Sequence, residues 1–232
     1  MKFKGFIDIH AHILPGLDDG PATMSEAIAL LKLLIADQVS TVIATPHVAP
    51  GFFWPYDTQI MQDKLFELRQ AADQEHLEIE IIGGAEIYLS PEVGILAEER
   101  KLPTLGNSDY VLVEFPRNEV PVWSFGVLKK LQKAGYKPIL AHPELNAGVR
   151  SDRDLVKDLH RMGVLLQVDA SSITGRWGGE VREFALKIIV DGLVFAVASD
   201  AHSPRRPPEL SEAQRILGER YPIVDPDNVI FC

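Results

Sequence analysis

Short runs of apolar and β-branched residues recur along the chain, and they alternate with longer stretches in which apolar residues return every three or four positions. The short runs are typical of strands that are buried on both faces of a parallel sheet. The predicted strands are residues 5–10, 41–46, 79–86, 110–115, 137–143, 165–170 and 193–200.

The longer stretches have the spacing of amphipathic helices. Several of them end at a glycine, as helix C termini commonly do. The predicted helices are residues 24–37, 59–75, 124–136, 152–163 and 180–192.

This alternation of strand and helix predicts a mostly parallel sheet, either closed as a barrel or open and doubly wound. The chain has 232 residues, of which 46% are apolar, so it can bury one core without disulfides or a structural metal. Residues 203–211 are rich in proline but too few to separate domains. We therefore expect a single domain over residues 1–232.

Charge and composition exclude several classes of protein. The net charge of -10 argues against non-specific nucleic-acid binding, although bound divalent cations could reverse the local sign inside a site. The chain has neither the apolar run of a signal peptide nor a stretch of about 18 uncharged apolar residues, so we expect no secretion and no membrane insertion. The single cysteine, Cys232, allows no disulfide, which fits a cytoplasmic protein.

Side chains that bind metal ions stand at the ends of nearly all the predicted strands. In parallel α/β architectures the carboxyl ends of the strands converge on one face, where ligands bind. His10 and His12 are two residues apart, so they lie on the same side of a strand and can share one ion. The candidate ligands at the strand ends are His10, His12, His47, Glu86, Glu114, His142, Asp200 and His202.

Each of these residues also has an ordinary interpretation. A single histidine near a strand end is more often a hydrogen-bonded core or loop residue than a metal ligand. The prediction of a metal site therefore depends on the number of such residues that stand at strand ends. His76 and His160 lie in polar helical stretches, and we interpret both as surface residues. Asp18 and Asp19 follow His12 closely in PGLDDGP, where they could form a turn or supply a ligand.

Further polar residues near the strand ends, and a search for other catalytic motifs, leave the prediction of a metal site unchanged. Glu144 could support a ligand or cap a helix, and Asp169 and Ser171 could cap a helix or line the mouth of the site. The chain has no P-loop, no G-x-S-x-G elbow and no H-E-x-x-H helix. Cys232 has no phosphate-binding loop after it, which excludes a cysteine phosphatase.

The motifs HAH, TPH, GAE, VEF, AHPE and SDAH occur in this order and together resemble the PHP (polymerase and histidinol phosphatase) superfamily. The opening DIHAHILPGLDDGP is similar to its branch of bacterial capsular and exopolysaccharide tyrosine-protein phosphatases. The resemblance extends from Asp8 to Arg206. It implies the PHP fold, a distorted TIM-like (β/α)7 barrel, with a cluster of three divalent ions that are commonly Mn.

The resemblance also implies which residues bind the ions. The first ion would be bound by His10, His12, Glu86 and Asp200, a second by Glu86, Glu114 and His142, and a third by His47, His202 and either Asp19 or Asp18. Arg206 matches an arginine that binds phosphate in the family.

Two departures from the family pattern bear on substrate binding. Leu145 stands where the branch often has an arginine, and residues 48–50 stand where basic residues or a second histidine often follow TPH. Arg150 and Arg205 are the candidates to compensate.

A site of imidazole and carboxylate without sulfur suits Mn, Fe or Zn. Three divalent ions and four carboxylates would leave a net charge of about +2, which attracts a phosphate dianion. A metal-bound hydroxide would attack phosphorus in line, while the ions and Arg206 stabilise the charge on the oxygens. Asp18 or His202 could protonate the leaving oxygen.

The resemblance implies a metal-dependent phosphatase acting on protein phosphotyrosine, with a bacterial tyrosine kinase of capsule or exopolysaccharide export as partner. Phe52, Phe53, Trp54 and Tyr56 could receive the tyrosine ring or pack against the barrel rim. The alternatives are a small-molecule phosphatase, such as one for histidinol phosphate, and a non-catalytic metal-binding module of polysaccharide machinery. An amidohydrolase also opens with H-x-H, but the chain has no convincing motif for a bridging lysine.

Overall fold

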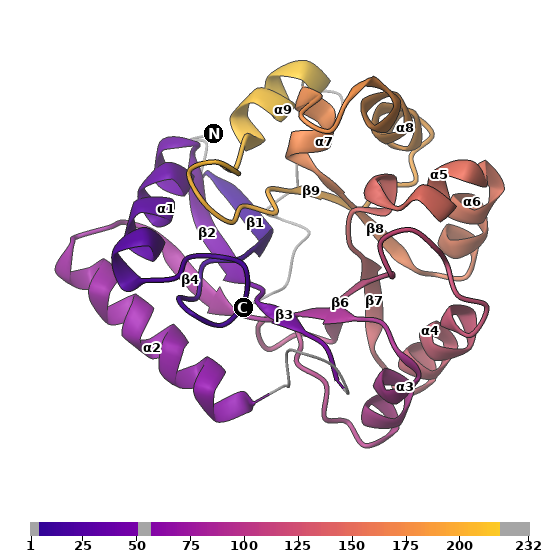
Figure 1. The fold of residues 1–232 in the computed structure, drawn as a ribbon, viewed down its shortest axis with the longest axis horizontal. Helices are drawn as coiled ribbons and strands as arrows, with labels where there is room; N and C mark the ends of the chain where they lie inside the picture. Colours follow the sequence, from indigo (N-terminus) through magenta and orange to yellow (C-terminus); the bar gives the residue numbers. More distant parts are fainter. Residues whose placement is uncertain (1–4, 51–56, 219–232) are drawn as a thin grey trace.

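The computed structural model of the protein describes residues 5–50 and 57–218. In this part of the chain every strand pairs in parallel with its neighbours, and the helices surround the strands (Figure 1). The strands of these residues are β1 (Phe6–Ala11), β2 (Val39–Ala44), β3 (His47–Val48), β4 (Glu80–Gly83), β5 (Glu86–Tyr88), β6 (Tyr110–Glu114), β7 (Lys137–Leu140), β8 (Leu165–Asp169) and β9 (Ala196–Ala198).

The strands form two sheets that are joined at two breaks in the chain. The first sheet has the strand order β1-β2-β4, and the second has the order β3-β5-β6-β7-β8-β9. Thr45 and Pro46 separate β2 from β3, and Gly84 and Ala85 separate β4 from β5. The sequence predicted one continuous strand over residues 79–86, and at the first place it predicted a strand over residues 41–46 that ends before β3. Pro46 explains the first break, because proline has no N–H to donate to a strand ladder.

The curl of the sheets brings the last strand alongside the first. Backbone hydrogen bonds of 2.8 and 2.9 Å join residues 10–12 to residues 200–201. The carboxylate of Asp8 in β1 accepts hydrogen bonds from the backbone N–H and the hydroxyl of Ser199, directly after β9. The structure therefore confirms the predicted α/β class, with a parallel sheet that curls back towards its first strand.

The five predicted helices are present, and the structure adds short helices after β5, β7, β8 and β9. These additional helices have too few turns for an apolar period to identify them. The helices of the described residues are α1 (Met24–Ala36), α2 (Thr58–Gln74), α3 (Pro91–Glu98), α4 (Ser124–Lys133), the 3-10 helix η1 (Pro143–Leu145), α5 (Ala147–Ser151), α6 (Arg153–Arg161), α7 (Ala170–Thr174), α8 (Gly179–Val190) and α9 (Leu210–Leu217). None of them is both long and apolar enough to cross a membrane.

The start of helix α1 fixes the end of the loop that carries Asp18 and Asp19. The hydroxyl of Thr23 accepts a hydrogen bond from the N–H of Glu26, and the Glu26 carboxylate accepts the N–H groups of Ala22 and Thr23 at 2.8 and 3.1 Å. This reciprocal capping box satisfies N–H groups that the helix itself leaves free. The two aspartates are therefore held between strand β1 and a firmly capped helix.

A small apolar cluster inside the curl lies beneath the polar strand ends. Side chains alternate along a strand, so residues two positions apart point to the same side. Leu112 belongs to the inner cluster, and Glu114 follows it on the same side of β6. The inner cluster consists of Ile9, Ile43, Leu105, Leu112, Ile139, Ala141, Ala196 and Ala198.

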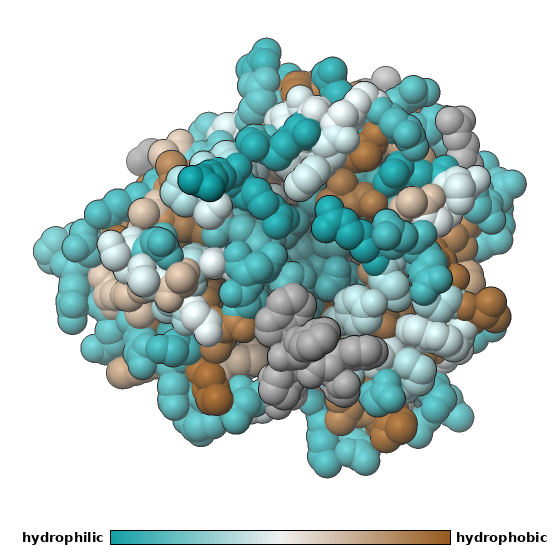
Figure 2. Space-filling view, viewed as in Figure 1, coloured by the Kyte–Doolittle hydropathy of each residue, from teal (hydrophilic) through white to brown (hydrophobic). Residues whose placement is uncertain are grey.

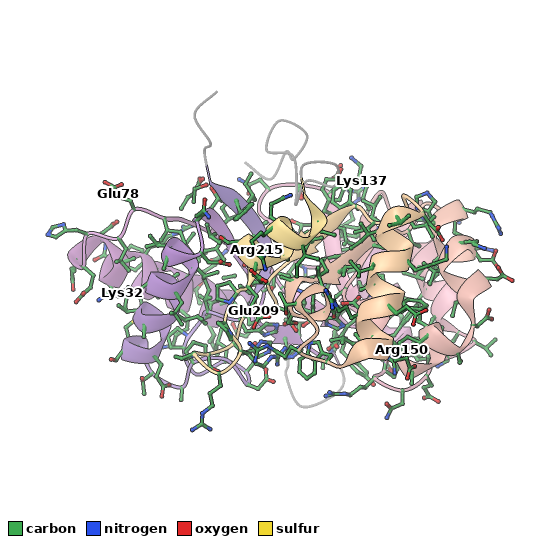
Figure 3. The ribbon with its side chains drawn as sticks, turned by 90° about the horizontal axis from the view of Figure 1, so that it is seen from above. Lys32, Glu78, Lys137, Arg150, Glu209 and Arg215 are labelled. Atoms are coloured by element: carbon green, nitrogen blue, oxygen red, sulfur yellow. The ribbon has the colours of Figure 1, made fainter. Side chains whose placement is uncertain are left out.

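All the strands point their carboxyl ends towards one face of the molecule. In Figure 3, Lys137 at the start of β7 lies at the upper edge, and Arg150 in α5, which follows this strand, lies at the lower edge. The lower side of Figure 3 is the face seen from the front in Figure 2, which shows a hollow lined by hydrophilic residues near its centre. The predicted site residues therefore lie on this face.

Candidate metal centre

Histidines and carboxylates from the strand ends meet in one cluster at the carboxyl end of the curled sheet. His10 Nε2 and His12 Nε2 lie 3.2 Å apart, and each lies 3.2 Å from Glu86 Oε2. Asp200 Oδ1 lies 3.4 Å from the first nitrogen and 3.5 Å from the second. All four residues are buried. Two nitrogens and two oxygens therefore converge on one buried point.

Glu86 is central to the cluster, because both of its carboxylate oxygens face histidines. Its Oε1 lies 2.8 Å from His142 Nε2, and its Oε2 lies 3.1 Å from His47 Nδ1. Glu114 Oε1 lies 3.3 Å from the same nitrogen of His47. The resemblance grouped Glu114 with His142, whereas the structure groups Glu114 with His47 and Glu86, and His142 with His10 and Glu86.

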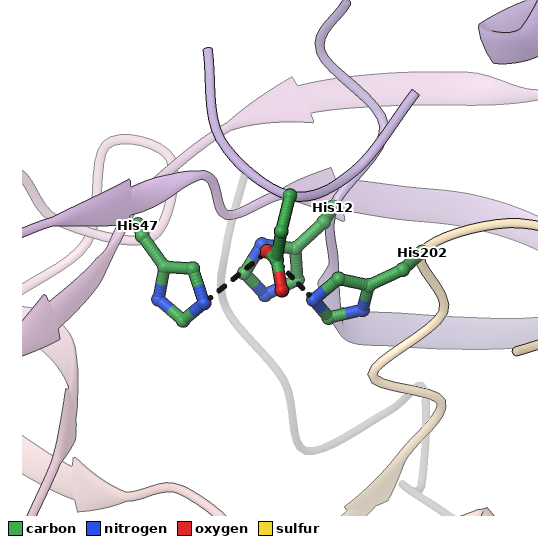
Figure 4. Close-up of side chains that lie close together, drawn as sticks. His12, His47 and His202 are labelled. Atoms are coloured by element: carbon green, nitrogen blue, oxygen red, sulfur yellow. Dashed lines mark ion pairs between the residues drawn. The ribbon is translucent and has the colours of Figure 1, made fainter. Parts of the chain in front are cut away.

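A further group of ligand atoms surrounds the carboxylate of Asp19. Its Oδ1 lies 3.2 Å from His202 Nε2 and 3.5 Å from His47 Nε2, and Figure 4 draws both ion pairs as dashed lines. Together with His12, these residues have ligand atoms within 4.8 Å of one another. Of the two adjacent aspartates, Asp19 is the one whose side chain faces His47 and His202.

Asp18 lies behind the cluster and orients it. One carboxylate oxygen accepts a hydrogen bond from His12 Nδ1 at 2.6 Å and from the backbone N–H of His47 at 2.9 Å. The other oxygen accepts the N–H of Gly20 at 2.9 Å. A proton on His12 Nδ1 leaves Nε2 free to bind a metal ion. Asp18 therefore holds His12 in the tautomer that a metal site requires.

A buried polar layer orients His10 in the same way. Gln167 donates its amide N–H to Asp169 Oδ1 at 2.9 Å, so its oxygen accepts a hydrogen bond from His10 Nδ1 at 2.9 Å. Glu144 Oε1 accepts the N–H of Asp169 and the hydroxyl of Ser172. Glu144 and Asp169, whose roles the sequence left open, therefore support the cluster from behind and fix the start of α7. Sequence reasoning missed Gln167, although it precedes the strand-end Asp169 by two residues.

The charges of the cluster shift the pKa values of its members. Burial lowers the pKa of His10, but the carboxylates of Glu86 and Asp200 outweigh burial and raise this pKa to about 9. Burial raises the pKa of Asp200, but the charges of His10, His202 and Arg206 outweigh it and lower this pKa to about 2. In the metal-free protein, positive charge on histidines such as His10 therefore offsets the negative charge of the carboxylates. Bound cations would supply this positive charge instead.

A cavity of about 190 Å³ opens above this cluster. The cluster residues form its floor. Its walls include an apolar part, from Phe115, Leu145 and Trp177, and a cationic part, from Arg117 and Arg206. The cavity therefore combines a polar floor with an apolar wall and two positive charges.

Arg206 is placed at the cavity by Asp200 and lies beside Trp177. Its guanidinium group donates to the Asp200 carboxylate and lies 5.8 Å from the centroid of the Trp177 ring. Arg117 also lines the cavity, is exposed, and makes no hydrogen bond or ion pair with the other described residues. Sequence reasoning missed Arg117, and its place three residues after Glu114 was the signal that could have found it.

The two arginines that were candidates to compensate for Leu145 do not line this cavity. Arg150 donates to the carbonyl oxygen of Glu144 at 2.9 Å and to Glu180 Oε1 at 3.2 Å, which holds its side chain elsewhere. Arg205 is exposed. Leu145 itself contributes to the apolar wall.

Residues away from the strand ends are placed as follows. His76 and His160 are exposed and lie outside the cluster, as predicted. The aromatic loop that contains Trp54 and the terminal Cys232 lie outside the described residues.

Comparison with known proteins shows what the chain is similar to. The family model described as "Capsular polysaccharide synthesis, CpsB/CapC" matches residues 6–230. The putative tyrosine-protein phosphatase CapC of Staphylococcus aureus is 36% identical over 85% of this chain and 77% of its own length. The tyrosine-protein phosphatase YwqE of Bacillus subtilis is 32% identical over the same shares of the two chains.

A solved structure gives the same relationship in three dimensions. It comes from work on YwqE of Bacillus subtilis and CpsB of Streptococcus pneumoniae, described as unique metal-dependent tyrosine phosphatases. The match has a TM-score of 0.87 at 31% identity, and it covers 91% of this chain and 86% of the other.

Proposed function

The chain belongs to the capsular polysaccharide synthesis family CpsB/CapC, and we propose that it is a metal-dependent phosphatase that hydrolyses phosphotyrosine in proteins. The observation that carries this proposal is that one oxygen of Glu86 and one oxygen of Asp200 each lie within 3.5 Å of the Nε2 atoms of both His10 and His12. Imidazole nitrogens and carboxylate oxygens that converge in a buried site fit a divalent cation. The two arginines of the cavity add charge that suits a phosphate group.

The cluster would hold three divalent ions, with Mn as the proposed metal and Fe or Zn as the alternatives that the same ligands suit. The four groups of ligand atoms share His10, His12, His47 and Glu86, so one residue could contribute to more than one ion. The residues that would bind the ions are His10, His12, Asp19, His47, Glu86, Glu114, His142, Asp200 and His202.

The chain's own residues would bind and orient the substrate. Arg206, held by Asp200, would donate hydrogen bonds to the phosphate oxygens, and Arg117, which also lines the cavity, is free to approach them. When bound, divalent ions supply Lewis acidity and a water of lowered pKa. The cavity then presents positive charge to a phosphate dianion although the protein as a whole is acidic.

His202 would bind an ion through Nε2, and a nitrogen that binds an ion carries no proton, so the leaving tyrosine oxygen would take its proton from water rather than from His202. Its Nδ1 donates to the carbonyl oxygen of Asp200 at 2.9 Å, which directs Nε2 towards Asp19 and the cavity. Asp18 was the other candidate from the sequence. Its carboxylate is engaged by His12 and two backbone N–H groups and does not line the cavity, so we propose for it the orienting role instead.

The natural substrate would be a phosphotyrosine protein, and the proposed partner is a bacterial tyrosine kinase of capsule or exopolysaccharide export. This part of the proposal draws support from the family and from the relatives' names. A cytoplasmic location would bring the phosphatase to the same compartment as such a kinase.

We also propose that residues 1–232 form one domain with a distorted seven-stranded barrel. Joining β2 to β3 and β4 to β5 across their two-residue breaks leaves seven strand positions among the described residues. The hydrogen bonds between residues 10–12 and 200–201 support closure between the first and last positions.

The test is hydrolysis of a phosphotyrosine peptide by chelator-stripped protein with Mn added back. We expect turnover that depends on Mn and is lost in His47→Ala and Glu114→Ala, because each variant removes a ligand atom from the cluster. His160→Ala removes an exposed histidine outside the cluster and should keep full activity.

Two other results would point elsewhere. A clear preference for histidinol phosphate over the phosphotyrosine peptide would assign the site to small molecules. Stoichiometric Mn uptake without hydrolysis of any phosphomonoester would indicate a non-catalytic metal-binding module.

A further inference from the structure

Among the residues that the structure describes, the apolar wall of the cavity contains one aromatic ring that is open to a ligand. Phe115 also belongs to this wall, but it is only 5% exposed and packs into the core. Trp177 is half-buried, and it lines the cavity beside Arg206. An indole ring in this position can contact a substrate directly.

Hydrogen bonding fixes the orientation of the Trp177 ring. Its Nε1–H donates to the hydroxyl of Ser171 at 2.8 Å, and Ser171 is a buried residue of α7, two positions after the end of β8. The polar edge of the indole is thereby satisfied inside the protein. The ring is left to act as an apolar surface of defined orientation.

The segment that carries Trp177 is tied to the segment that carries Arg206. The Glu209 carboxylate, labelled in Figure 3, accepts hydrogen bonds from the hydroxyl of Thr174 and from the guanidinium group of Arg176. Arg176 also donates to the carbonyl oxygen of Arg205 at 3.2 Å. The loops that follow β8 and β9 therefore form one wall, which holds the indole and the arginine at a fixed spacing.

We propose that Trp177 is a specificity-determining residue of the phosphatase site, on which the phenyl ring of phosphotyrosine packs while its phosphate group reaches Arg206 and the metal-binding floor. The inference rests on the proposed function. An aromatic ring gains both buried area and favourable ring-to-ring geometry against an indole. Phosphoserine has no ring to place there and gains neither.

The test compares Mn-loaded wild type with Trp177→Ala, Trp177→Phe and the matched control Trp123→Ala. Trp123 is 38% exposed and does not line the cavity. The readouts are kcat and KM for a phosphotyrosine peptide, and the inhibition constant of inorganic phosphate, which probes the phosphate subsite without a ring.

We expect Trp177→Ala to lose about tenfold in kcat/KM, mainly through KM, from the loss of one aromatic contact. Trp177→Phe should keep most of the activity, and the control should match wild type. The inhibition constant of phosphate should stay within about twofold of wild type in all variants, because the phosphate group does not need the ring. If Trp177→Ala does not fold, Trp177→Leu takes its place, because leucine keeps apolar volume without an aromatic face. The expected loss of kcat/KM is the same.

Two results would overturn the inference while leaving the proposed function intact. One is an unchanged kcat/KM in Trp177→Ala. The other is a weakening of phosphate inhibition equal to the loss of kcat/KM, which would mean that Trp177 acts only by holding Arg206. Absence of phosphotyrosine hydrolysis in wild type would instead overturn the proposed function, and this inference with it.

Discussion

Asp18 and Asp19 are adjacent in the sequence, yet their side chains point to different partners. Asp19 faces His47 and His202, whereas Asp18 turns back to accept three hydrogen bonds behind His12. Both aspartates have lowered pKa values: histidine neighbours and hydrogen bonds favour the ionised carboxylates against the opposing effect of burial. At the scale of the residue, the loop therefore supplies one candidate ligand and one group that orients a ligand.

The orienting role of Asp18 gives a prediction for Asp18→Asn. Asparagine has one oxygen where aspartate has two, so its NH₂ group must face one of the donors that Asp18 accepts, from His12, Gly20 or His47. We expect Mn affinity to fall about 10–100-fold, as for other groups that orient a metal-binding histidine. Titration of Mn into the stripped variant measures this loss, and activity should return at high Mn concentration. Unchanged affinity would show that His12 keeps its orientation without the carboxylate.

Metal binding should release protons, because the metal-free cluster holds them on histidine. Glu86 and Asp200 raise the pKa of His10 to about 9 against the effect of burial. Below that pH an ion must displace the proton, so apparent Mn affinity should rise with pH, by about tenfold per unit for each proton displaced. Calorimetry in two buffers of different ionisation enthalpy counts these protons. Affinity that is constant from pH 6 to pH 8 would contradict the prediction.

At the scale of the element, the loop between β1 and α1 is shaped by close contacts. A Cβ atom on Gly20 would lie 2.8 Å from the carbonyl oxygen of His12 and 3.0 Å from Asp18 Oδ1. The absence of a side chain at Gly20 is what allows the loop to pass so close to β1. The capping box at Thr23 then holds the other end of the loop.

Gly20→Ala should therefore disturb both stability and the site. We expect the free energy of unfolding to fall by about 1–3 kcal/mol, as for other overpacked positions, together with weaker Mn binding. Gly126→Ala is the matched control: Gly126 is exposed in α4 with no atom near a new Cβ, so alanine there should stabilise by about 0.5–1 kcal/mol. Thermal and denaturant unfolding of the two variants measures both effects. Equal stability of the two variants would remove the argument for a steric requirement at Gly20.

At the scale of the whole molecule, Asp8 joins the two ends of the curled sheet. Its carboxylate accepts hydrogen bonds from the N–H and the hydroxyl of Ser199, which lies 191 residues away in the sequence. It also accepts a hydrogen bond from the N–H of His10. Burial raises the pKa of Asp8 to about 6 in spite of these hydrogen bonds, because it disfavours the ionised carboxylate. We therefore expect the hydrogen-bond acceptors at this position to contribute more to stability than its charge.

Asp8→Ala should destabilise the fold by about 3 kcal/mol, because it leaves several buried donors without an acceptor. Asp8→Asn should lose much less. Its oxygen can accept the two backbone N–H groups, and its NH₂ group can donate to the hydroxyl of Ser199, which rotates to accept. Denaturant unfolding of the metal-free proteins compares the two variants without a contribution from bound Mn. A loss in Asp8→Asn as large as in Asp8→Ala would show that the charge itself is required.

The sequence by itself determined the class of the fold, the positions of the strands and longer helices, and the side chains that stand at the strand ends. These features depend on local periodicity and on the rule that parallel strands share a carboxyl face, so they can be recognised without coordinates. His10 and His12 were found in this way, as was Asp200.

Only the tertiary structure decided how the strand ends are grouped. In the folded chain Glu114 Oε1 lies 3.3 Å from His47 Nδ1, in one group of ligand atoms with Glu86. The curl of the sheets brings Gln167 behind His10, and it brings Arg117 and Trp177 to the cavity from loops far apart in the sequence. Distances between separate loops depend on packing over the whole sheet, and no local pattern of residues encodes them.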